Sequence, residues 1–192
     1  MKSTRKELMP GVMLTCVRTE KFKTGCLSIS LLTQLSRDCA PSSAIIPRVL
    51  RRGTALYPDM EAISRELDEL YGARIVPTVR KKGELQALGF YSDFADDAFL
   101  PGGERILQKL FSLAGEILLR PATRGGLLIP DYVNSEKEKL LDEIRAQVND
   151  KRSYSMQRLF ELMCFGEAYA VNRLGNEDEA ESITYRKLTR TY

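Results

Sequence analysis

The stretch AIIPRVLRRGT at residues 44–54 decides the fold expected for this chain. Its four large apolar residues recur at a spacing that places them on one face of a helix: Ile45, Ile46, Val49 and Leu50. We therefore predict a helix with a buried face that runs into a basic turn. Ser42 or Ser43 is the expected N-cap. The interior Pro47 predicts a late start or a kink, because proline removes a helical hydrogen bond.

Hydrophobic periodicity predicts the elements around this helix. Strands are expected over residues 10–19, 25–35, 74–80 and 84–94, and the last two should form a hairpin around Lys81-Lys82-Gly83. Helices are expected from Pro58-Asp59 to Gly72 and over residues 104–120, 133–150, 153–165 and 176–182, with Val148 facing inward, a loop over 96–103 and a further element beginning at 185–192. Strands followed by consecutive helices predict an α+β fold, in which an antiparallel-rich sheet has helices packed on one face.

The composition is that of an ordinary globular domain. Of the 192 residues, 43% are hydrophobic and 29% are charged, and the formal net charge is +3. Basic residues are scattered, and the pairs Arg51-Arg52 and Lys81-Lys82 are interpreted as solvated turns, so we expect no nucleic-acid partner. No apolar run is long enough to cross a bilayer, and the basic N-terminus leads into no signal-peptide-like region. We therefore expect neither membrane insertion nor export.

The cysteine and histidine content indicates the cellular compartment and limits the possible catalytic mechanisms. The four cysteines, Cys16, Cys26, Cys39 and Cys164, show no C-x-x-C spacing. Cys16 and Cys26 lie in apolar strand patterns, where a free thiol behaves as a small hydrophobe. Together they favour a reducing, cytoplasmic compartment. The chain contains no histidine, which excludes Cys-His and Ser-His-Asp catalysis.

Short motifs occur in a fixed order on both sides of the central stretch. They are Lys21-Phe22-Lys23-Thr24, Arg52-Gly53-Thr54, Leu70-Tyr71-Gly72-Ala73, Asn149-Asp150-Lys151 and Met163-Cys164. Their order and spacing resemble one half of the insulinase/pitrilysin family of zinc peptidases, whose halves are α+β sandwiches related to mitochondrial processing peptidase. The combination is similar to the catalytically silent companion chains that Gram-positive bacteria carry beside an active peptidase. That group is linked to modification of elongation factor P.

The resemblance places the family's His-x-x-Glu-His motif on Ala44, Pro47 and Arg48. The family's zinc requires two imidazoles and a carboxylate from a later helix, with the motif glutamate as general base. None of the three motif residues here can serve these roles. The third-ligand position matches Glu143, with Glu136 one heptad earlier. The resemblance therefore implies that the chain has no catalytic residues, metal or cofactor.

Two interpretations of Glu136 and Glu143 remain open at this point. They can be the ordinary polar edge of an amphipathic helix, or they can retain the family geometry with Glu143 facing Arg48. In the second case the arginine replaces zinc as the counter-charge of the carboxylate. Removing Arg48 should then destabilise the chain by roughly 3–5 kcal/mol, more than removing an exposed arginine such as Arg51.

Residues 1–192 are interpreted as a single half-domain, truncated at its C-terminal end, from the N-terminal half of a longer chain. The expected function is that of a non-catalytic subunit. Such a subunit would complete a peptide-binding chamber with a zinc-bearing homologous peptidase chain, and the chamber would hold a peptide or protein substrate. The alternatives are a zinc-dependent endopeptidase with a degenerate site at Glu136 and Glu143, or a free-standing scaffold.

Overall fold

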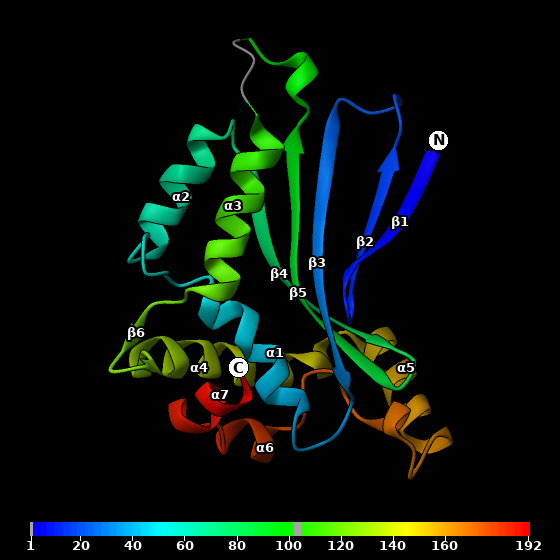
Figure 1. Ribbon diagram of the computed structural model, residues 1–192. Coiled ribbons are helices and arrows are strands. Elements are labelled where there is room, and N and C mark those ends of the chain that lie inside the picture. The colour runs from blue at the N-terminus through cyan, green and yellow to red at the C-terminus, as the bar shows by residue number, and fades with distance from the viewer. Residues whose placement is uncertain (1, 102–104) are drawn as a thin grey trace.

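The computed structural model describes residues 2–101 and 105–192 (Figure 1). The strands are β1 (Lys2–Met9), β2 (Val12–Arg18), β3 (Thr24–Gln34), β4 (Arg74–Lys82), β5 (Leu85–Ala95), β6 (Thr123–Arg124) and β7 (Leu127–Leu128). The helices are α1 (Ala40–Leu50), α2 (Met60–Glu69), α3 (Ile106–Leu119), α4 (Pro130–Ala146), α5 (Lys151–Met163), α6 (Glu177–Glu181) and α7 (Tyr185–Thr191). Three 3₁₀ turns complete them: η1 (Asp97–Phe99), η2 (Gln147–Asn149) and η3 (Ala168–Ala170). The expected α+β fold is confirmed.

The central sheet is antiparallel, with the strand order β3-β5-β4. The predicted hairpin is present, but its turn consists of Gly83 and Glu84 and not of Lys81-Lys82-Gly83. Lys81 and Lys82 still pair with β5, opposite Gln86 and Leu85. The turn instead uses Gly83, whose φ of +63° is a left-handed conformation that glycine adopts without steric cost.

The first two strands form a separate hairpin, of which hydrophobic periodicity predicted only the second strand. The expected strand over residues 10–19 is β2, and it pairs with β1, which we did not predict. Every residue of β1 and β2 is exposed, so neither strand carries the buried alternation by which a strand is recognised. Cys16 is therefore exposed rather than packed in a core, and Cys26 in β3 is exposed as well.

Helix α1 is the centre of the core. Every residue of α1 except Arg48 is buried, which is typical of a helix covered on all sides. The helix begins at Ala40 and contains Pro47, so the late start, one of the two expected consequences of this proline, is wrong. Its N-cap is Cys39, which makes no side-chain hydrogen bond, and Ser42 and Ser43 lie inside the helix. Pro41 explains the earlier start, because proline is well tolerated in the first turn of a helix.

The other helices surround this core. Figure 1 shows α2 and α3 beside the sheet, and α1, α4, α6 and α7 together at one end of it. Asp59, which we expected inside the first turn of this helix, is instead the N-cap of α2 and accepts a hydrogen bond from Ala62 N at 2.8 Å. The expected end of the loop at Gly103 and the expected helix start at Glu104 lie outside the described residues.

Helix α4 positions the carboxylates of the site. It begins at Pro130, before the predicted start at residue 133, because proline again occupies the first turn. It ends at Ala146 and gives way to η2, so Val148 is exposed, contrary to the expectation that it faces inward. Helix α4 packs against α1, with Val133 and Leu140 fully buried.

Candidate functional site

The last turn of α1 meets the inner face of α4 through an ion pair. Arg48 Nη2 lies 2.6 Å from Glu143 Oε2, which is the expected counter-charge geometry. The other carboxylate oxygen of Glu143 lies 3.7 Å from Arg173 Nη2. The arginine of the degenerate motif therefore pairs with the carboxylate that matches the family's third ligand.

Glu136 lies deeper than Glu143. Its residue surface is only 6% exposed, so the interpretation as a polar helix edge is wrong for this residue. Its Oε1 accepts hydrogen bonds from Arg52 Nη1 at 3.0 Å and from Lys139 Nζ at 2.7 Å. The Arg52 guanidinium also lies 5.2 Å from the centre of the Tyr132 ring, which adds a cation–π contact. Glu136 is thus a buried carboxylate with two cationic partners.

The remaining motif positions belong to the core. Ala44 is completely buried, and Pro47 is buried as well. Zinc is bound by sulfur, imidazole nitrogen or several carboxylates, whereas these positions offer only Glu143, which already accepts from Arg48. Within residues 2–101 and 105–192, no three cysteine or acidic side chains are placed to hold a metal ion. The residues present do not fit the zinc of an active peptidase.

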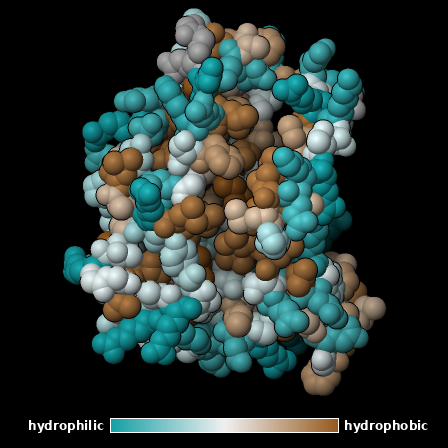
Figure 2. Space-filling model, in the orientation of Figure 1, coloured by the Kyte–Doolittle hydropathy of each residue, from teal (hydrophilic) through white to brown (hydrophobic). Residues whose placement is uncertain are grey.

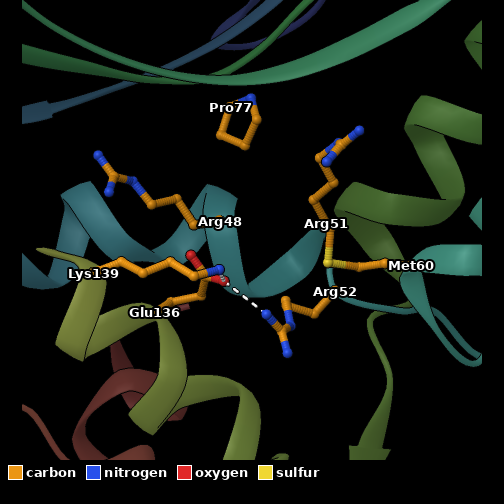
Figure 3. Close-up of a pocket in the computed structure, with 7 residues that line it drawn as sticks. All are labelled: Arg48, Arg51, Arg52, Met60, Pro77, Glu136 and Lys139. Atoms are coloured by element: carbon orange, nitrogen blue, oxygen red, sulfur yellow. Dashed lines mark hydrogen bonds and ion pairs between the residues drawn. The ribbon is translucent and has the colours of Figure 1, made fainter. Parts of the chain in front are cut away.

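A pocket of about 140 Å³ opens between α1, α4 and strand β4 (Figure 3). Its lining residues are Arg48, Arg51, Arg52, Met60, Pro77, Glu136 and Lys139. Figure 3 shows the Arg51 side chain extending toward the Pro77 side of the space, away from the Arg52–Glu136 pair. Burial lowers the pKa of Arg51, and the charge of Glu136 partly offsets this effect.

Arg51, Arg52 and Lys81, which we interpreted as parts of solvated turns, are partly buried, and this corrects that interpretation, whereas Lys82 is exposed. Arg51 and Arg52 line the pocket. Lys81 Nζ donates to Tyr169 O at 2.5 Å and to Val171 O at 3.0 Å, and it lies 4.3 Å from the centre of the Tyr169 ring. The partners of Arg52 and Lys81 come from distant parts of the chain, so no local sequence signal could have revealed them.

Solved structures share this fold. The structure of a conserved protein from Enterococcus faecalis V583 is 23% identical, with a TM-score of 0.87 over 98% of this chain and 44% of that one. A peptidase M16 inactive domain from Pseudomonas fluorescens is 15% identical, with a TM-score of 0.72 over 100% of this chain and 43% of that one. At these identities the likeness shows the fold alone.

A curated relative adds homology to the shared fold. The probable inactive metalloprotease YmfF of Bacillus subtilis (strain 168) is 35% identical over 182 residues, which is 95% of this chain. The chain is therefore homologous, over nearly all of its own length, to part of a protein named as a probable inactive metalloprotease. No family model matches it. The resemblance expected from the sequence is thereby confirmed.

The chain spans less than half of the length of the relatives that it matches. It covers 43% of the Bacillus subtilis protein. Homology over this part alone does not establish the activity or the partners of the whole protein. Among the described residues, no helix is both long enough and apolar enough to cross a membrane.

Proposed function

We propose that this M16-type homologue is part of a non-catalytic subunit that completes a peptide-binding chamber with a zinc-bearing homologous peptidase chain. The observation that carries the proposal is the ion pair between Arg48 and Glu143. A guanidinium keeps its proton at all physiological pH values, so it acts as a permanent counter-charge and never as a metal ligand. A partner would therefore have to supply the zinc.

The edge of the central sheet supports a peptide-binding role. Strand β4 lies at one edge of the sheet, and its Pro77 lines the pocket beside the degenerate motif. An extended peptide can add to such an edge by main-chain hydrogen bonds. Proline is tolerated in a strand where its nitrogen faces away from the neighbouring strand. The outward donors next to the pocket would then come from Ile75 and Val79, which alternate with Pro77.

Uncovered apolar surface supports the presence of a partner. Figure 2 shows apolar side chains gathered in a hollow near the centre of the face in view. The exposed apolar residues of the chain include Leu31 and Leu32 of β3 and Leu107 and Phe111 of α3. Exposed apolar surface on this scale is typical of protein interfaces. We expect the pair of full-length chains to bury at least about 1,000 Å² in total.

The proposal also concerns the domain organisation of the protein and its cellular compartment. We propose that residues 1–192 form one half-domain of a longer protein and that this protein acts in the cytoplasm. Cys16, Cys26, Cys39 and Cys164 are all free, which fits a reducing compartment. The companion role and the cytoplasmic setting agree with each other, because a zinc-bearing partner made in the same compartment could assemble without export.

Co-expression tests the companion role directly. The full-length protein is produced together with a homologous chain that has an intact His-x-x-Glu-His motif, and the mixture is analysed by size-exclusion chromatography and a peptide-cleavage assay. We expect co-elution and faster cleavage than the histidine-bearing chain gives alone, because an enclosed chamber orients the peptide and excludes water. Separate elution together with equal activity of the zinc chain alone would leave the free-standing scaffold as the better explanation.

A further inference from the structure

The pocket beside the degenerate motif contains one cation without an ion pair. Arg48 pairs with Glu143, and both Arg52 and Lys139 pair with Glu136. Arg51, by contrast, forms no ion pair and no side-chain hydrogen bond with any residue that the structure describes. Its Nε is buried and has no hydrogen-bond partner, and the same holds for the Nε of Arg52, whose Nη1 is nevertheless paired with Glu136. A polar group of this kind requires a partner, because leaving it unsatisfied away from water is costly.

The charge of the pocket identifies the kind of partner. Four cationic side chains face the pocket, and the two carboxylates next to it are already paired with three of them. Glu136 is the carboxylate nearest to an incoming anion, and its charge is matched by Arg52 and Lys139. The remaining positive charge of Arg51 therefore attracts an anion into a partly desolvated space, where electrostatic attraction is stronger than in water.

The shape of the pocket suits a small ligand. Its volume of about 140 Å³ is enough for a few waters or one small oxyanion. Figure 3 shows Arg48 and Arg51 on opposite sides of the open space below Pro77, with Lys139 at its base. The planar guanidinium fork binds carboxylate and phosphate groups in bidentate fashion, and Arg48 keeps free donors although it contacts Glu143.

We propose that this pocket binds a small oxyanion, a carboxylate or a phosphate group, with Arg51 as the principal ligand and Arg48 as the second. The anion would lie beside the last turn of α1, next to Arg48. This inference requires no partner chain. It is therefore tested separately from the companion role.

Nuclear magnetic resonance of the arginine side chains provides the direct test. The chain is titrated with inorganic phosphate and, in a second series, with acetate, at an ionic strength held constant with sodium chloride. We expect a saturable shift of the Arg51 Nε–Hε resonance, because an anion bound by the guanidinium changes the electronic environment of its Nε. Saturation by phosphate alone identifies a phosphate-type ligand, and saturation by acetate alone identifies a carboxylate. If neither anion gives a saturable response, the proposal is wrong.

Two substitutions make the test specific. Arg51→Gln should weaken binding of the responding anion at least about tenfold, since a charge-assisted hydrogen bond is lost. Arg65→Gln is the matched control, because Arg65 is an exposed arginine of α2 whose loss should leave the affinity unchanged. Equal affinity in Arg51→Gln and the parent chain would contradict the assignment. If Arg51→Gln does not fold, the Nε–Hε titration of the parent chain decides the question by itself.

Discussion

Arg48 Nη2 and Glu143 Oε2 lie 2.6 Å apart although 95 residues separate them in the sequence. The contact ties the last turn of α1 to α4, so it joins two helices that also pack against each other. The Glu143 side chain is 38% exposed and also has Arg173 nearby. Because both side chains are partly exposed, this ion pair should contribute little to stability.

Arg48→Ala should lower the free energy of unfolding by only about 1 kcal/mol, because a partly exposed ion pair contributes little. This is less than we expected for a buried pair. The matched control is Arg65→Ala rather than Arg51→Ala, since Arg51 proves to be half-buried while the Arg65 side chain is 70% exposed. Urea denaturation of the three proteins measures the difference. A loss of several kcal/mol for Arg48→Ala would show that Glu143 is effectively buried.

Arg52→Ala should have the larger effect, with a loss of roughly 2–4 kcal/mol, because it removes one partner of the buried Glu136 carboxylate. Lys139 remains bonded to Glu136 and limits the loss. A double-mutant cycle with Glu136→Gln separates the pair from the rest of the pocket. If Arg52→Ala is no more destabilising than Arg48→Ala, the burial of Glu136 does not increase the contribution of its ion pair to the free energy of unfolding.

Zinc binding can be measured directly. We expect the purified chain to retain no stoichiometric zinc, because Ala44, Pro47 and Arg48 stand at the motif positions and offer no ligand. Elemental analysis after dialysis against metal-free buffer is the measurement. A tightly held zinc ion in every chain would contradict this prediction and would revive the alternative of a degenerate zinc endopeptidase.

Gly53→Ala should lower stability by about 1–3 kcal/mol, because a Cβ there would lie 2.5 Å from the backbone oxygen of Pro58. The backbone would have to move next to Arg52, so the pocket should be disturbed as well. Gly115→Ala in α3 is the matched control. It meets nothing within 4 Å, and alanine favours the helix, so this change should stabilise by about 0.5–1 kcal/mol. Thermal denaturation distinguishes the two variants, and equal melting temperatures would contradict the clash.

The sequence by itself determined the main features of this chain. The spacing of Ile45, Ile46, Val49 and Leu50 predicted a buried helix, and all four residues are buried. Alternation predicted β3 and the β4–β5 hairpin, because a strand with one buried face has a period of two. The frame of the degenerate motif predicted the contact between Arg48 and Glu143. The absence of histidine, read directly from the composition, already argued against a zinc site of the family type.

Only the tertiary structure decided how deeply the charged side chains lie. Glu136 appears in the sequence as one more acid on a polar helix, and it is buried only because α4 packs against α1. Lys81 appears as a turn residue, yet its partners are the carbonyl oxygens of Tyr169 and Val171. Arg51 forms no ion pair with any described residue, because the carboxylates near the pocket are already paired with other cations. Periodicity describes one element at a time, whereas burial and pairing depend on which elements meet.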